Sequence, residues 1–142
     1  MNSVSKGTKD DVKLLVLKHD PNARPAAHDF AGLFHFAILV PGRRSLAHAF
    51  SALEAKNVSF DGFADHLVSE SLYLHDLERN GIEIYRDRPT SDWKRDKLGR
   101  VVMDTLPLDI DNLTDELVEE DLKNDQETFP NGARIGHTRT FA

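Results

Sequence analysis

The sequence contains no cysteine and no long apolar run, and its acidic residues outnumber its basic ones. The absence of cysteine excludes disulfides, thiolate metal sites and a cysteine nucleophile. No segment approaches the roughly 20 apolar residues that span a membrane, and the polar N-terminus does not have the form of a signal peptide. A formal net charge of -6 argues against nucleic acid or an anionic membrane as the main partner. We therefore expect a cytoplasmic protein.

The 142 residues are enough for one domain with a modest hydrophobic core. An apolar fraction of 39% and a charged fraction of 30% are typical of a soluble globular protein. Changes in the residue pattern along the chain divide it into three parts. These are an N-terminal strand and loop (1–31), a central module (32–88), and a linker with an acidic helix and a terminal strand (89–142).

The N-terminal part contains one predicted strand, Val12 to Leu17, which is short and apolar and includes two β-branched residues. The polar residues before it are expected to fray. Residues 19–31 contain Asp-Pro-Asn and Arg-Pro, which predict a loop. His19 and His28 lie in this loop, and we expect both to be ordinary solvated side chains.

The central module opens with a strand that carries a single polar side chain. Every residue from Leu33 to Val40 is apolar except His35, so both faces of this strand are expected to be buried. An imidazole without a hydrogen-bond partner in such surroundings costs about 1–3 kcal/mol. His35 must therefore find a partner, either as a hydrogen-bonded core residue or as a metal ligand.

A helix is predicted from Arg43 to Lys56, because its apolar residues recur at helical spacing. They form one stripe of Leu46, Ala49, Phe50 and Leu53. His48 lies off the stripe and is expected to be exposed.

Three short strands are predicted at 58–60, 68–74 and 81–86, separated by turns at Gly62 and at 76–80. In the last strand, alternation places Glu83 on the face opposite the two isoleucines. The order of strand, helix and three strands predicts an α+β fold built on one βαβββ module. Because a single module leaves an open concave face and unpaired edges, we expect a homodimer.

The C-terminal part begins as a loop, in which Trp93 is expected to anchor the chain on the domain surface. A short strand is predicted at Arg100 to Met103. The acidic segment that follows also contains apolar residues at helical spacing, and their thin stripe predicts an amphipathic helix at 112–123. Its charged face is either solvated or docks a partner. A final strand, which contains His137, is predicted at 133–142.

Three segments of the chain carry a resemblance to a known family. They are Gly32-Leu33-Phe34-His35-Phe36-Ala37, Asp65-His66-Leu67-Val68-Ser69-Glu70-Ser71-Leu72-Tyr73-Leu74, and Asn80-Gly81-Ile82-Glu83-Ile84-Tyr85 followed by Asp87-Arg88-Pro89. These segments resemble the vicinal oxygen chelate superfamily, which includes glyoxalase I, bleomycin-resistance proteins and type I extradiol dioxygenases. The closer similarity is to proteins like catechol 2,3-dioxygenase.

The spacing of the extradiol signature fits this sequence in part. The residues at permitted spacings are His66, Leu72, Tyr73, Asp76 and Glu83. Leu77 stands where the signature has proline, and Arg79 stands where it has glycine. The turn between the last two strands therefore departs from the pattern.

The resemblance implies a ring-cleaving dioxygenase that acts on a small catechol-like aromatic substrate and O2. It implies Fe(II) as the metal, with Mn, Zn or Ni as alternatives, and assigns His35 and Glu83 as metal ligands. It further implies that His66 is the acid–base catalyst and that Tyr73 hydrogen-bonds the substrate. His75, on the third predicted strand of the module, has no such role and is expected to be an ordinary side chain.

In this family the second histidine ligand comes from the first strand of the preceding module, which this sequence does not contain. The chain resembles a second module, a linker and the opening of a third. The open sources of the missing ligand are a partner chain, His137, or none. Three other functions stay open: a glyoxalase-like lyase or isomerase, a metal-free module that binds a cationic ligand, and an inactive shortened copy.

Overall fold

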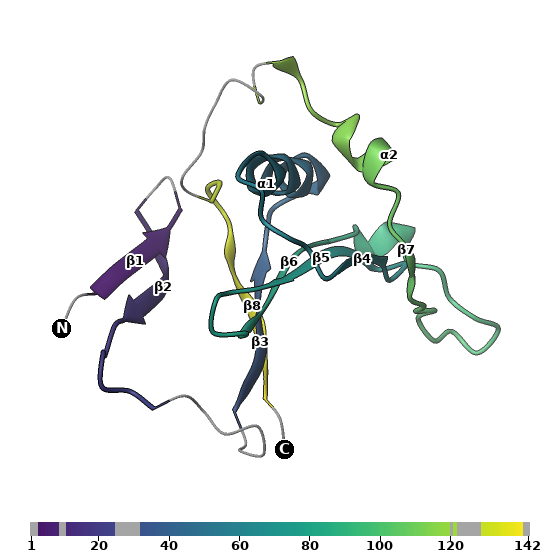
Figure 1. The fold of residues 1–142 in the computed structure, drawn as a ribbon. Coiled ribbons are helices and arrows are strands. Elements are labelled where there is room, and N and C mark those ends of the chain that lie inside the picture. The colour runs from purple at the N-terminus through teal and green to yellow at the C-terminus, as the bar shows by residue number, and fades with distance from the viewer. Residues whose placement is uncertain (1–2, 9–10, 25–31, 120, 122–128, 141–142) are drawn as a thin grey trace.

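The structure is a computed structural model that describes residues 3–8, 11–24, 32–119, 121 and 129–140. The chain forms a two-stranded sheet and a six-stranded sheet (Figure 1). The small sheet pairs β1 (Ser3–Gly7) with β2 (Lys13–Lys18). The other elements are β3 (Leu33–Leu39), α1 (Arg43–Ala55), β4 (Gly62–Asp65), β5 (Ser69–His75), β6 (Gly81–Asp87), the 3-10 turn η1 (Thr90–Asp92), β7 (Leu106–Pro107), α2 (Ile110–Thr114) and β8 (Arg134–Thr140).

The larger sheet has the strand order β7-β4-β5-β6-β3-β8. β3 pairs in parallel with β6, and the other neighbouring strands are antiparallel. A parallel pair needs a long crossover connection, which here runs through α1, β4 and β5. The order β3-α1-β4-β5-β6 confirms both the α+β class and the predicted sequence of elements in the central module.

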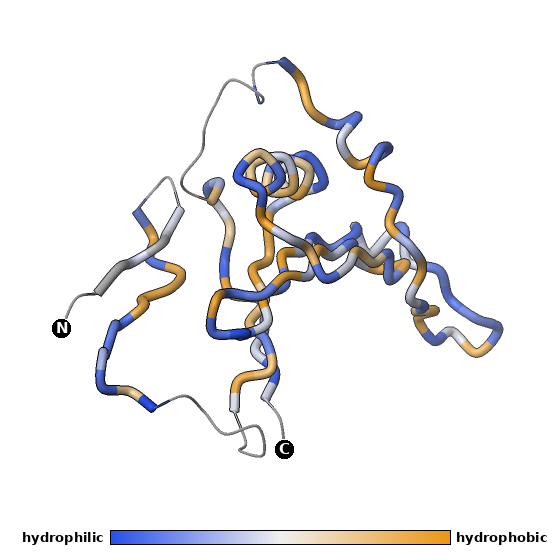
Figure 2. Tube along the Cα trace, viewed as in Figure 1, coloured by the Kyte–Doolittle hydropathy of each residue, from blue (hydrophilic) through white to orange (hydrophobic). Residues whose placement is uncertain are grey.

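The hydrophobic core lies between the larger sheet and α1, which covers one side of the sheet (Figure 1). Phe36, Ile38 and Val40 alternate along β3 towards the helix, and Leu46 and Phe50 meet them from α1. Hydrophobic and hydrophilic residues alternate around this helix (Figure 2). Because neighbouring side chains of a strand point to opposite faces, the intervening residues of β3 lie on the face away from α1.

A buried cluster of charged side chains, Glu70 with Arg43, Arg86 and Arg88, links α1 and the residues after β6 to the larger sheet. Glu70 on β5 is only 2% exposed. Its carboxylate accepts hydrogen bonds from Arg43 Nε of α1 at 3.1 Å and from Arg86 Nε of β6 at 2.8 Å. Arg88 donates to the same carboxylate at 3.0 Å, and Arg43 reaches the backbone oxygen of Asn112 in α2 at 3.1 Å. Charged partners on three sides make the burial of this carboxylate tolerable.

Two predictions about the N-terminal half need correction. The strand expected at 58–60 lies instead at β4, so the turn expected at Gly62 is wrong. Phe60 stacks on Phe50 of α1 with ring centroids 5.3 Å apart, and this packing places Phe60 in the core rather than in a strand ladder. The N-terminal residues expected to fray form β1, which pairs with the predicted strand now seen as β2.

Burial also differs from the prediction at both ends of the β3–α1 unit. Leu33 and Phe34 are about two-fifths exposed, so β3 is buried on both faces only from its middle onwards. His48, expected to be exposed, is half-buried, and its Nε2 has no hydrogen-bond partner among the described residues. The spacing of apolar residues within α1 does not take into account packing by other elements, such as the contact between α2 and α1.

The C-terminal part departs further from the predictions. Residues 100–103 form no strand, and only an isolated bridge joins Val101 to Arg95. The acidic helix is much shorter than expected within the described residues: α2 is capped by Asp109, which accepts a hydrogen bond from Asn112 N. Leu113 is fully buried in the core, so its side of α2 packs internally. Positions 120, 122 and 123 of the predicted helix lie outside the described residues, as does His28.

The predicted terminal strand is confirmed as β8, which pairs with β3 at the edge of the larger sheet. The predicted anchor is also in place, since Trp93 is half-buried and donates from Nε1 to the backbone oxygen of Arg88 at 3.0 Å. None of the helices in the described part of the chain has the length and apolar character needed to cross a membrane.

Candidate metal centre

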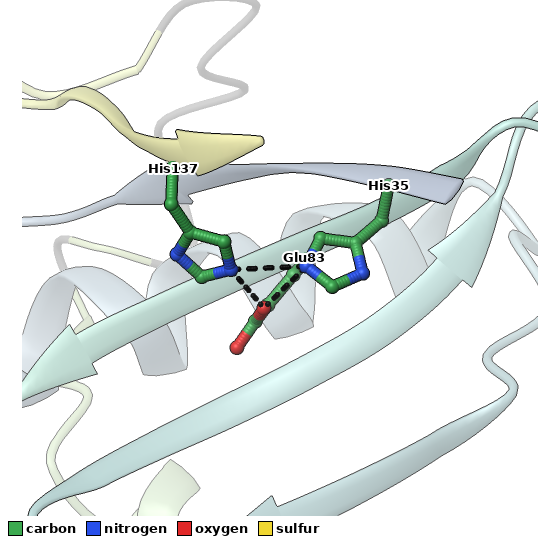
Figure 3. A group of neighbouring side chains, drawn as sticks. All are labelled: His35, Glu83 and His137. Atoms are coloured by element: carbon green, nitrogen blue, oxygen red, sulfur yellow. Dashed lines mark hydrogen bonds and ion pairs between the residues drawn. The ribbon is translucent and has the colours of Figure 1, made fainter. Parts of the chain in front are cut away.

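Three side chains converge on the face of the larger sheet away from α1: His35 of β3, Glu83 of β6 and His137 of β8 (Figure 3). The strand register explains why they meet. Ala37 of β3 lies opposite Glu83 on one side and opposite His137 on the other, and His35 precedes it by two positions on the same face. The small side chain of Ala37 leaves room between the two flanking residues, so all three polar groups can approach one point.

The distances within this group suit a bound metal ion. His35 Nε2 and His137 Nε2 lie 2.9 Å apart, and Glu83 Oε2 lies 3.4 Å from the first and 3.2 Å from the second. Metal–ligand bonds of about 2.1 Å place neighbouring ligand atoms about 3.0 Å apart at right angles and about 3.4 Å apart in a tetrahedron. The observed separations fall in this range, so the donor atoms fit a divalent cation without rearrangement.

The electrostatic environment also favours metal binding. Burial lowers the pKa of His35 below 6.5, although the Glu83 carboxylate opposes this shift, and His137 and Arg139 add to it. His35 is therefore a neutral imidazole at pH 7, which is the form that binds a metal. Glu83 is almost fully buried, whereas the His137 side chain is 46% exposed. Solvent therefore reaches the group from the β8 side.

The second oxygen of Glu83 is held by two hydroxyl groups of β5. Ser71 Oγ donates to Glu83 Oε1 at 2.8 Å, and the Tyr73 hydroxyl donates to the same oxygen at 3.2 Å. Burial raises the pKa of Tyr73, so its hydroxyl keeps its proton at neutral pH. Glu83 Oε2 thus faces the two imidazoles, and Glu83 Oε1 faces the two hydroxyl groups of β5.

A hydrogen-bonded chain continues from Tyr73 to His66. His66 Nε2 lies 3.0 Å from the Tyr73 hydroxyl, and His66 Nδ1 lies 3.1 Å from the backbone oxygen of Asp104. His66 stands in the tight turn between β4 and β5, where Leu67 has a left-handed φ of 68°. Such a conformation is strained for leucine, and a hydrogen bond of 2.8 Å from Leu67 N to Asp65 Oδ1 holds it. This turn fixes the position of His66 relative to the three side chains of the candidate metal centre.

Two glycines allow the strands that carry the ligands to approach closely. A Cβ atom at Gly81 of β6 would overlap the backbone oxygen of Phe34 and lie 2.8 Å from the Cβ atom of His35. A Cβ atom at Gly136 would overlap the hydroxyl of Tyr85, whose ring packs against His137 with centroids 5.6 Å apart. Glycine at these positions thus sets the spacing around both histidines.

One of three comparisons with known proteins found a similar protein. The chain is 42% identical over 125 residues to the Catechol-2,3-dioxygenase of Bacillus subtilis (strain 168), a match that covers 87% of the chain. The chain is therefore similar to part of that protein. The match covers 42% of that relative, so the chain spans less than half its length. No family model matches the sequence, and no solved structure matches it.

The structure brings together all four residues singled out from the sequence. His35 and Glu83 lie in the candidate metal centre, and Tyr73 and His66 adjoin it through hydrogen bonds. Of the sources left open for the second histidine, His137 of the same chain is the one that lies beside His35 and Glu83.

The other histidines that the structure describes lie apart from this group. His75 pairs with Asp61 at the surface, with Nδ1 and Oδ2 2.7 Å apart, and His19 is exposed.

Sequence reasoning missed two residues around the centre. Neither Ser71 nor Gly136 has a role in the sequence-based prediction. Ser71 shares a face with Tyr73, and that face meets Glu83 across the sheet. The signal that could have found Ser71 is its place two residues before Tyr73, on the same side of a predicted strand.

Proposed function

We propose that this chain forms the metal site of an extradiol dioxygenase that cleaves a catechol-like aromatic substrate with O2. The observation that carries the proposal is the group of two imidazoles and one carboxylate at metal-ligand spacing. This ligand set, with open positions on the metal, is typical of non-haem Fe(II) oxygenases. The similarity to a catechol-2,3-dioxygenase supports the same reaction class. Fe(II) is the proposed metal, and Mn, Zn or Ni are the alternatives.

The role of the chain is to hold the metal and to move a proton beside it. His35, Glu83 and His137 would bind Fe(II), which supplies positions for the catechol oxygens and O2. The buried side chains of His35 and Glu83 would exclude water from one side of the site, and the exposed side at His137 would admit substrate. Three protein donors leave room for the substrate to bind through two oxygens.

His66 is the proposed proton carrier. The backbone oxygen of Asp104 can only accept, so His66 Nδ1 carries a hydrogen and Nε2 is the nitrogen that exchanges a proton with Tyr73 or substrate. Tyr73 lies between His66 and the ligand Glu83, and its hydroxyl can orient a substrate hydroxyl near the metal. Proton transfer by a positioned histidine contributes typically 10²–10⁴-fold to a rate.

The ligand set argues against the glyoxalase alternative. A glyoxalase-like site would use a second glutamate, whereas the described residues around this centre offer two imidazoles and one carboxylate. A metal-free binding module would not need three donor atoms at ligand spacing. These observations favour the dioxygenase.

We further propose that the chain acts as a homodimer. β8 forms one edge of the larger sheet, and its seven residues are exposed. Leu33, Phe34 and Ile135 expose apolar surface beside this edge. An unpaired, partly apolar edge strand is a ready site for pairing with another sheet. A monomer by light scattering at micromolar concentration would contradict this proposal.

Activity is tested on protein reconstituted with Fe(II) under anaerobic conditions and then given catechol and air. We expect a yellow ring-opened product, followed by its absorbance, from the wild-type chain and none from His35→Ala. His75→Ala is the matched control, since it removes a surface imidazole that lies outside the centre. Bound iron without ring cleavage of catechol or its substituted forms would contradict the reaction class while leaving the metal site in place.

A further inference from the structure

We propose that Ser71 is a positioning residue of the metal centre. Its hydroxyl holds Glu83 so that Oε2 alone is presented to the metal. The inference rests on the proposed metal site and adds a residue that neither the signature nor the ligand set includes. It does not require Ser71 to touch either metal or substrate.

The first argument is burial. Ser71 is 0% exposed, in the middle of the sheet between β4 and β6. Its neighbour in the strand, Leu72, is part of the core. A hydroxyl group buried without a partner is costly, and the partner it has is Glu83 Oε1 at 2.8 Å. The shortest hydrogen bond of the Ser71 hydroxyl is thus to the carboxylate of the proposed metal ligand Glu83.

The second argument concerns Tyr73, the other group on Glu83 Oε1. The Tyr73 hydroxyl has one proton and two acceptors in reach, His66 Nε2 at 3.0 Å and Glu83 Oε1 at 3.2 Å. When that proton points to His66, Glu83 loses this hydrogen bond. Ser71 is the other donor to Oε1, and its contact is the shorter of the two.

The hydrogen bond from Ser71 would also decide how many coordination positions of the metal the protein occupies. A carboxylate oxygen that accepts a hydrogen bond from Ser71, and in one arrangement a second from Tyr73, has less capacity left for a metal, so Glu83 would bind through Oε2 only. The chain then supplies three donor atoms and leaves the remaining positions for substrate. Without Ser71, the carboxylate can rotate and offer both oxygens. Loss of such a supporting hydrogen bond typically weakens metal affinity by about 10–100-fold.

The test is a titration of metal-free protein with Co²⁺ alone, followed by calorimetry and by the visible absorption of the bound ion. We expect Ser71→Ala to raise the Kd for Co²⁺ by about 10–100-fold and to shift the absorption bands, because the carboxylate changes its binding mode. Ser71→Thr keeps the hydroxyl and should restore both. Ser69→Ala is the matched control, because Ser69 lies on the same face of β5 but opposite Asp87 rather than beside Glu83.

Thermal unfolding of each metal-free variant separates a binding defect from a folding defect. If Ser71→Ala does not unfold cooperatively, Ser71→Cys replaces it, since a thiol is close in size and is a weaker donor; an intermediate rise in Kd is then expected. A Kd and spectrum like those of the wild type in either variant would overturn the role of Ser71.

The metal site itself is judged in the same experiment by His137→Ala. If the wild type binds Co²⁺ and His137→Ala does not, the proposed site stands whatever Ser71 does. If the wild type binds no Co²⁺, the proposed site fails, and the role of Ser71 fails with it.

Discussion

Replacing Glu70 by glutamine tests whether the buried ion cluster holds the fold together. Glu70 is 2% exposed and accepts hydrogen bonds from three arginines, of which Arg86 has a side chain only 10% exposed. The substitution keeps the shape and removes the charge. Arg86 is then left in a buried position without a carboxylate. Breaking a buried pair in this way costs about 3–5 kcal/mol.

The same change at Glu116 provides the comparison. Glu116 also binds Arg43, at 3.1 Å, but its side chain is 43% exposed. Solvent screens an exposed pair, which contributes about 0–1 kcal/mol. The two substitutions are chemically identical and share one arginine, so the difference between them reports the effect of burial.

The assay is thermal and denaturant unfolding of the metal-free protein. For a domain of this size, about 1 kcal/mol shifts the Tm by about 2–4 °C. Taking the lower end of the cost, about 3 kcal/mol, Glu70→Gln should lower the Tm by about 6–12 °C, and Glu116→Gln should lower it by less than about 4 °C. Equal shifts for the two variants would refute the argument that burial of Glu70 decides the effect.

Three further outcomes follow from the structure. Gly81→Ala should destabilise the fold by about 1–3 kcal/mol and weaken Co²⁺ binding, because a Cβ atom there would meet the backbone of Phe34 and the side chain of His35. Gly62→Ala is the control, because a Cβ atom at Gly62 would meet nothing within 4 Å. This variant should change neither the stability nor the Kd in the same unfolding and titration measurements. Leu113→Ala should cost about 2–5 kcal/mol in denaturant unfolding, since Leu113 is fully buried, and a smaller loss would show that α2 is only loosely docked. Metal added at 100 times its Kd should stabilise the protein by about 2.7 kcal/mol, seen as a rise in Tm that Glu83→Gln abolishes.

Local patterns were enough to predict much of the central module. The lone imidazole in β3 marked His35 as a side chain that needs a partner, and the alternation in β6 placed Glu83 opposite the isoleucines. The resemblance to the family then assigned both residues as metal ligands. The spacing of the apolar residues and the positions of turn residues placed β3, α1, β5 and β6 within a few positions of where the structure has them. These features depend on neighbours in the sequence, and for that reason the sequence shows them.

Features that depend on long-range pairing were not predictable in the same way. The role of His137 follows from the pairing of β8 with β3, across about a hundred residues, with a register shift between Ala37 and Ile38. β4 was misplaced because Phe60 has the β-propensity of a strand residue but packs on α1. The short α2 reflects capping by Asp109 and the burial of Leu113, which the length of the acidic segment does not reveal.

The most direct test of the metal centre is an anaerobic titration of the metal-free protein with Fe(II), for the wild type and for His137→Ala. His137 is the candidate ligand that the structure adds to His35 and Glu83, and its Nε2 lies 3.2 Å from Glu83 Oε2. We expect one Fe(II) per chain in the wild type and no saturable binding in the variant. Unchanged stoichiometry and affinity in His137→Ala would contradict a site made of His35, Glu83 and His137.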